Sequence, residues 1–183
     1  MALTATMYRF RVDLSDVDRG VYEQLDLRAA RHPSETLRYL VTRVLAYALS
    51  HQDGIAFTRG LFEADEPALW VRQPDGRVDH WIEVGRPAVD RLHKASQRAA
   101  RVSVFTHEPP ELLRREASGA RVHRGNTIAL WTLPLPVVTA LEGAVDRSTA
   151  FTLVRNEEQL YLTLGGRTHE GTVTRAALVD PKA

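Results

Sequence analysis

The stretch that decides the fold of this chain reads Asp79-His80-Trp81-Ile82-Glu83-Val84-Gly85. Its side chains alternate: His80, Ile82 and Val84 fall on one side and Asp79, Trp81 and Glu83 on the other, which is the two-residue period of a β-strand. Residues 69–72 also have strand character, and the intervening residues 73–77 contain the Pro and Gly of a turn. The sequence therefore predicts a β-hairpin.

Acidic side chains gather along this hairpin. Asp79 and Glu83 project from one face of its second strand, and Asp65 and Glu66 lie near the start of its first strand. Carboxylates collected at the edge of a sheet are ligands that divalent cations prefer. We therefore expect these four residues to supply the ligands of a Mg²⁺ or Mn²⁺ site.

Length and composition predict a single domain over residues 1–183. A chain of 183 residues with 44% hydrophobic and 26% charged residues can bury one sizeable core. The formal net charge of +1 predicts no strong general attraction to nucleic acid, although a local basic patch is compatible with it.

The absence of cysteine from the sequence excludes disulfides and thiolate zinc sites. No run of residues reaches the roughly 20 apolar residues of a membrane span, and Arg9 and Arg11 interrupt any signal-peptide core. We expect a cytoplasmic protein that does not enter a membrane. The histidines show no zinc-site spacing, and none is expected to be a ligand.

Upstream of the hairpin, residues 7–13 and 21–27 alternate and predict a second hairpin. Residues 31–35 resemble a helix start, where Pro33 is tolerated in the first turn and Ser34 or His32 can satisfy free amides. The helix that follows has one apolar stripe, made of Leu37, Leu40, Val41, Val44, Leu45, Ala48 and Leu49.

The rest of the chain continues to alternate strands and helices. Residues 88–100 form a predicted helix that carries basic residues on one side, at Arg91, Lys94, Arg98 and, just beyond its end, Arg101. Further strands are predicted at 55–61, 102–106, 127–133, 149–155, 159–164 and 171–176, and further helices at 108–117 and 136–145. The fold class is α/β, a mixed β-sheet flanked by helices.

Between Pro33 and Thr106 the element order is helix, three strands, helix, strand, which resembles the core of the restriction-endonuclease-like, or PD-(D/E)XK, nuclease fold. Several short stretches of the sequence resemble the YaeQ family of bacterial proteins. They are residues 1–6, 30–36, 57–61, 65–67 with Trp70, 81–85 and 94–95. The resemblance implies a variant of the nuclease core at about 33–106, with an N-terminal hairpin and C-terminal strands added. The YaeQ family has no established activity.

The nuclease resemblance implies a role for each acid. Glu83 matches the acid of the third strand, which would hold the metal against a scissile phosphate. The aspartate expected after Pro67 is replaced by Ala68, so Glu66, Asp65 or Asp79 would have to stand in. Glu35 matches an extra acid near the first helix.

The resemblance also implies a lysine that this chain lacks at the expected position. Where a nuclease carries a lysine that orients the attacking water, this chain has Gly85. Lys94 on the following helix is the candidate to replace it, and Arg91 and Arg98 on the same helix are candidates for phosphate contacts.

Two functions follow from these residues. The first is a Mg²⁺-dependent phosphodiesterase acting on nucleic acid, with Glu83, Lys94 and Glu35 as catalytic residues. The second is a non-catalytic, nuclease-like scaffold that binds a protein or nucleic acid partner, which the changes at Gly85 and Ala68 favour. Each candidate also has a structural interpretation: Glu83 in an ion pair, Glu35 favoured by a helix N-terminus, and the other acids exposed to solvent.

Overall fold

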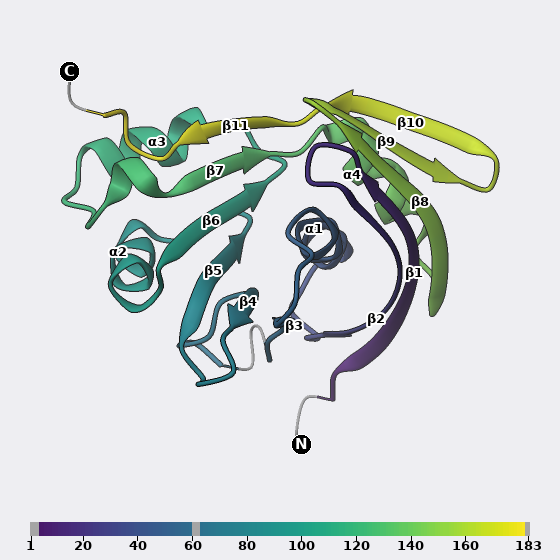
Figure 1. Ribbon diagram of the computed structural model, residues 1–183, viewed down its shortest axis with the longest axis horizontal. Helices are drawn as coiled ribbons and strands as arrows, with labels where there is room; N and C mark the ends of the chain where they lie inside the picture. Colours follow the sequence, from purple (N-terminus) through teal and green to yellow (C-terminus); the bar gives the residue numbers. More distant parts are fainter. Residues whose placement is uncertain (1–3, 60–62, 182–183) are drawn as a thin grey trace. The chain divides into compact units, whose positions relative to one another are not determined.

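The structure is a computed structural model that describes residues 4–59 and 63–181. The chain divides into two compact units (Figure 1). The first unit contains the chain up to Leu49 together with Leu133–Val173, and the second contains Ser50–Thr132 and the chain from Thr174 onward. The assignment of residues 1–183 to one domain stays a prediction.

The first unit is built on a five-stranded sheet with the strand order β10-β9-β8-β1-β2. Strand β1 pairs antiparallel with β2 and parallel with β8, so this sheet is mixed. The elements of the unit are β1 (Thr6–Asp16), β2 (Val21–Arg31), α1 (Leu37–Leu49), α4 (Leu135–Ala144), β8 (Ser148–Asn156), β9 (Gln159–Leu164) and β10 (Arg167–Thr172).

The alternation in β1 decides which face of this sheet is buried. Phe10, Val12 and Leu14 are buried, whereas Arg11 and Asp13 between them are exposed. Helices α1 and α4 contact the sheet, and Figure 1 shows both on the inner side of its curve. The predicted N-terminal hairpin is confirmed, with strands longer than expected.

Helix α1 has the predicted apolar stripe, and Leu40, Val41, Val44 and Leu45 are fully buried. Its predicted start is wrong, because the helix begins at Leu37. Thr36 caps it in place of Ser34 or His32: the Thr36 hydroxyl accepts a hydrogen bond from the amide of Tyr39 at 3.1 Å.

The second unit is built on a six-stranded mixed sheet with the order β11-β7-β6-β5-β4-β3. Strands β4 and β5 form the predicted antiparallel hairpin, and β5, β6 and β7 are parallel neighbours. The elements are β3 (Ile55–Phe57), β4 (Leu69–Arg72), β5 (Val78–Val84), α2 (Val89–Arg98), β6 (Arg101–Thr106), α3 (Glu111–Ser118), the short 3₁₀ helix η2 (Gly125–Thr127), β7 (Ala129–Thr132) and β11 (Thr174–Ala177).

The core of the second unit lies between its sheet and helices α2 and α3. Trp81 from β5 and Val104 from β6 pack in it with Leu92 of α2 and Leu113 of α3. Trp70 pairs directly with Trp81 across the hairpin, so both rings lie on the face that carries Glu83.

The predicted α/β class and the element order from α1 to β6 are confirmed. The expected single mixed sheet is wrong, because the described strands form two sheets. The segment predicted as one last strand at 171–176 is divided at Val173, with β10 in the first sheet and β11 in the second. None of the described helices has the length and apolarity needed to cross a membrane.

Candidate functional site

Glu83 lies near the end of β5 and is only 3% exposed. Trp81 faces the same side of the strand, and its Nε1 donates a hydrogen bond to Glu83 Oε1 at 2.7 Å. Arg91, in the first turn of α2, donates from Nε to the same oxygen at 2.6 Å. The carboxylate is therefore paired in the way that a buried charge requires.

Arg91 also holds the segment that precedes β4. Its two terminal nitrogens donate to the main-chain carbonyls of Ala64 and Glu66. One planar guanidinium thus connects β5, α2 and residues 64–66. It can do so because its N–H donors point in several directions within one rigid plane. The ion pair of Glu83 with Arg91 is a structural clamp.

Burial raises the pKa of Glu83 above the ordinary value of a glutamate carboxyl. The positive charge of Arg91 and the hydrogen bonds from Trp81 and Arg91 oppose this rise without cancelling it. The folded protein therefore holds a proton on this carboxyl more readily than the unfolded chain does.

Two further residues expected to join Glu83 have partners of their own. Asp79 accepts a hydrogen bond from Arg101 Nη2 at 2.6 Å. Lys94 forms an ion pair with Asp90, one turn earlier on α2, at 2.8 Å. Among the described residues, neither side chain is hydrogen bonded to Glu83.

The acids before β4 also differ from one another. Glu66 accepts hydrogen bonds from the side chain and the main-chain amide of Arg59, each at 3.1 Å, and the side-chain bond is the main reason that its pKa is lowered. Asp65 is exposed. Only Asp65, of these two acids, faces the cavity beside α2.

That cavity has a volume of about 170 Å³ and belongs entirely to the second unit. It brings together five of the residues that carry the site hypothesis or surround it, namely Asp65, Trp81, Arg91, Lys94 and Arg98. The lining includes small side chains, among them Ala88, just before α2, and Ala95 on α2. In this cavity the predicted cationic residues of α2 lie beside Asp65, whereas the ion pair of Arg91 with Glu83 lies outside its lining.

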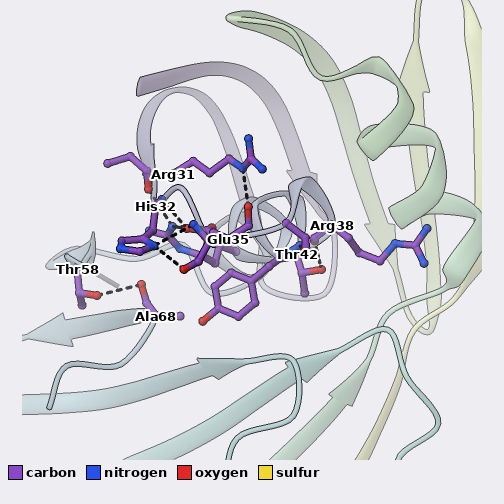
Figure 2. Close-up of polar contacts among 12 residues, drawn as sticks. Arg31, His32, Glu35, Arg38, Thr42, Thr58 and Ala68 are labelled. Atoms are coloured by element: carbon purple, nitrogen blue, oxygen red, sulfur yellow. Dashed lines mark hydrogen bonds and ion pairs between the residues drawn. The ribbon is translucent and has the colours of Figure 1, made fainter. Parts of the chain in front are cut away.

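The structure gives a physical reason why position 85 has no lysine and position 68 has no aspartate, the two residues that the nuclease resemblance led us to expect. Gly85 has φ +79°, a conformation that a side chain such as lysine strains. Ala68 is 1% exposed, and the Thr58 hydroxyl donates to its carbonyl at 3.4 Å and to that of Pro67 (Figure 2). An aspartate at position 68 would be a buried charge.

Glu35 belongs to the first unit and is also in a buried ion pair. Its Oε1 lies 3.0 Å from Arg43 Nη1, and both side chains are 1% exposed. The amide of His32 donates to Glu35 Oε2 at 3.1 Å, and Arg31 Nε donates to the Glu35 carbonyl at 2.7 Å (Figure 2). These contacts fix the turn that leads from β2 into α1.

The donor set as it stands does not fit a divalent cation. Glu83, Asp79 and Glu66 each face an arginine, and no group of three or more His, Cys, Asp or Glu side chains in residues 4–59 and 63–181 is arranged around a common point. A metal ion needs several oxygen ligands directed at one position. Trp81 and Arg91 both bond Oε1 of Glu83, so a metal ion at this carboxylate would have to bind beside the positive charge of Arg91.

Sequence reasoning placed Arg91 on a phosphate and did not identify it as the partner of Glu83. The separation of eight residues crosses a strand end, a turn and a helix start, so no local periodicity joins the two. The positive φ of Gly85 could have been predicted from the sequence, because a glycine directly after a strand and before a helix favours positive φ.

Comparison with known proteins agrees with the observed fold. A family model described as "YaeQ protein" matches residues 1–173. Two bacterial proteins, both called "Uncharacterized protein YaeQ", are 42% (Escherichia coli K12) and 40% (Salmonella typhi) identical over 107 residues. These matches span 58% of this chain and 59% of each relative.

Solved structures match over nearly the whole chain. The crystal structure of YaeQ protein from Pseudomonas syringae has a TM-score of 0.86 at 35% identity, and covers 93% of this chain and 95% of its own. The YaeQ protein of Xanthomonas axonopodis pv. citri has a TM-score of 0.85 at 30% identity, with 97% and 100% covered. The chain belongs to the YaeQ family.

Proposed function

We propose that this protein is a nuclease-like scaffold that binds a nucleic acid strand without cleaving it. One observation carries the proposal: the carboxylate of Glu83, which a PD-(D/E)XK nuclease would give to a metal ion, accepts hydrogen bonds from Trp81 and Arg91 instead. The order α1, β3, β4, β5, α2, β6 supports the relation to that nuclease core. A fold alone decides no activity, so the site geometry has to carry the functional conclusion.

The side of α2 that lines the cavity supplies the binding surface. Arg98 is exposed and has no hydrogen bond or ion pair within the described part of the chain. Lys94 and Arg91 line the same cavity at helical spacing. Lys94 is paired with Asp90, an exposed acid of the same lining, and Arg91 is held by Glu83, so Arg98 is the cation of the three that is most available to a phosphate. Cationic side chains in a row on a helix suit successive phosphates of a strand.

Binding is measured by fluorescence anisotropy with labelled single-stranded and duplex oligonucleotides, at low salt and with EDTA present. We expect binding without metal and a weakening of about two- to tenfold in Arg98→Gln, with the salt slope reduced by about one, as for one lost phosphate contact. Arg77→Gln is the matched control, because Arg77 is exposed in the β4–β5 turn and pairs with Asp75.

Absence of binding at low salt contradicts the proposal. An equal loss in Arg98→Gln and Arg77→Gln also contradicts it, because this pattern indicates general charge attraction instead of a surface on α2. Binding that requires Mg²⁺ or Mn²⁺ supports the second candidate instead.

The second candidate is a metal-dependent phosphodiesterase. It is favoured by the position of Asp65 and Lys94, which line the cavity that also contains Arg91, the partner of Glu83. In that case Glu83 with Asp65, Glu66 or Asp79 would bind Mg²⁺ or Mn²⁺, Glu35 would assist, and Lys94 would contact phosphate or water. The metal would supply charge stabilisation at the scissile phosphate.

Cleavage of the same oligonucleotides in Mn²⁺ separates the candidates. Cleavage by the unmodified protein that is lost in both Glu83→Gln and Asp65→Asn establishes the phosphodiesterase. Binding without cleavage, unaltered by Mn²⁺, is the result expected of the scaffold. A protein partner would have to be sought if neither binding nor cleavage occurred.

A further inference from the structure

The sheet of the first unit has a second face that its helices leave uncovered. Helices α1 and α4 pack on the face that carries Phe10 and Leu14 (Figure 1). The opposite face, here called the outer face, carries the alternate residues of β2, β1, β8 and β9. These include Gln24, Asp13, Thr152 and Thr163, which are direct neighbours across the strands in that order. This face is mixed, because it also carries Met7 and Tyr22, which are exposed, and the partly exposed Val154.

A hollow of about 710 Å³ lies on the outer face. Ala150, Thr152, Thr163 and Gly165 form its small-residue floor, whereas Arg11 and Gln24 are longer side chains beside them. All lining residues belong to the first unit. The volume falls within the range of about 300–1,000 Å³ that is typical of small-molecule sites.

Most polar groups of the hollow are not used by the protein itself, although the Thr163 hydroxyl shares a hydrogen bond of 2.9 Å with the Thr168 hydroxyl. Arg11, Asp13, Gln24 and Thr152 make no hydrogen bond or ion pair through their side chains within residues 4–59 and 63–181. Their neighbour Asp26 is different, because Arg9 holds it through two hydrogen bonds. The hollow therefore contains donors and acceptors whose partners have to come from solvent or from a ligand.

The charges in and beside the hollow almost cancel. Arg11 and Asp13 line it together, and Asp26 in the lining is offset by Arg9 beside it, whose hydrogen bond is the main reason that the pKa of Asp26 is lowered; Arg28 nearby adds one positive charge. A site with so little net charge offers little advantage to a phosphate or to a polycation. The floor of threonine hydroxyls and the amide of Gln24 both donate and accept, as the hydroxyl groups of a sugar do.

We propose that this hollow binds an uncharged, hydroxyl-rich ligand, a short oligosaccharide. The Asp13 carboxylate accepts hydrogen bonds from two adjacent sugar hydroxyls, Arg11 donates to ring or glycosidic oxygens, and Gln24 and Thr152 complete the contacts. This site is independent of the proposed function, because its residues belong to the first unit and those of the α2 cavity belong to the second.

The test titrates maltotriose, cellotriose and chitotriose into the isotope-labelled full chain and follows the amide signals by NMR. At least one trisaccharide is expected to shift amides of residues 150–152 and 163–165 in a saturable way. Asp13→Asn and Thr152→Val, which keep the shape of each side chain, are expected to weaken that binding about three- to tenfold, the effect of one lost hydrogen bond.

Arg28→Gln is the matched control. Arg28 is exposed on the same face of β2 but does not line the hollow, so binding should stay within about twofold of the unmodified protein. The proposal is overturned if none of the trisaccharides shifts these amides, if inorganic phosphate shifts them instead, or if Arg28→Gln weakens binding as much as Asp13→Asn does.

Discussion

At the scale of single residues, two buried groups of the second unit decide how stability responds to pH. Glu83 is buried with a partly exposed arginine, and His80, on the opposite face of β5, is 8% exposed. The Nε2 of His80 lies 2.8 Å from the Ser103 hydroxyl. Each group has a pKa that differs between the folded and unfolded chain, so each links folding to protons.

Replacement of Arg91 by methionine leaves the Glu83 carboxylate buried without its cation. We expect a loss of about 2–3 kcal/mol in the free energy of unfolding at neutral pH, below the roughly 3–5 kcal/mol of a fully buried pair, because Arg91 is 33% exposed. Chemical denaturation measures the loss. Arg98→Met, on the same helix, should cost less than about 0.5 kcal/mol, and equal costs in the two variants would contradict the clamp.

The pH dependence of the Arg91→Met loss follows from the raised pKa of Glu83. Because the folded state holds this proton more tightly, the stability from this group is fully present below the ordinary carboxyl pKa and is lost as pH rises through the folded pKa. Without Arg91 the folded pKa rises further. The variant should therefore lose stability over a wider and higher pH range than the unmodified protein.

His80 acts in the opposite direction. Burial, with a smaller contribution from Arg101, lowers its pKa from 6.5 to about 4. The unfolded chain takes up the proton first, so stability is fully present above pH 6.5 and falls by roughly 3 kcal/mol as pH drops toward 4. His80→Gln, which can keep a hydrogen bond to Ser103, should remove this part of the acid sensitivity. Identical pH profiles of Tm for both proteins would contradict the assignment.

At the scale of elements, the sequence predicts what local periodicity encodes. The apolar stripe of α1, the β4–β5 hairpin and the acids of β5 all follow from spacing over a few residues. The parallel pairing of β1 with β8 joins residues such as Arg9 and Ser148, whose contact has no local signal. This pairing is why two sheets form where one was expected.

The same reasoning applies to the candidate site. Spacing along β5 predicted that Asp79, Trp81 and Glu83 share a face. The hydrogen bond from Trp81 to Glu83 confirms this for those two residues, whereas an irregularity in the β4–β5 pairing at Asp79 interrupts the alternation and lets Val78 pack with Trp81. The arginine partners of these acids come from α2 and β6. Which cation reaches which carboxylate depends on how those elements pack, so the sequence alone could not predict it.

The end of β5 provides a test of the lysine that the nuclease resemblance led us to expect. Gly85→Lys introduces that residue, but position 85 has φ +79°. We expect a cost of about 1–2 kcal/mol in the free energy of unfolding from the strained backbone, and no gain of Mn²⁺-dependent cleavage. Gly20→Lys, also at positive φ but in the exposed β1–β2 turn, is the control for stability. Cleavage gained by Gly85→Lys would contradict the scaffold proposal.

At the scale of the whole molecule, positive and negative charges nearly cancel, but cationic side chains are concentrated on one side of α2. The formal net charge is +1, yet the cations of α2 that line one cavity are Arg91, Lys94 and Arg98. In the first unit, Glu35 is fixed by Arg43 in the same manner as Glu83 by Arg91. Both acids that the nuclease pattern would make catalytic are therefore parts of structural ion pairs in this member of the YaeQ family.

The most direct measurement is calorimetric titration of Mn²⁺ into the unmodified protein and into Glu83→Gln. We predict the same weak, non-saturating heats for both proteins, because Trp81 and Arg91 already bond Oε1 of Glu83 and the positive charge of Arg91 lies beside the carboxylate. A saturable Mn²⁺ site in the unmodified protein that disappears in Glu83→Gln would contradict this prediction and make Glu83 a metal ligand.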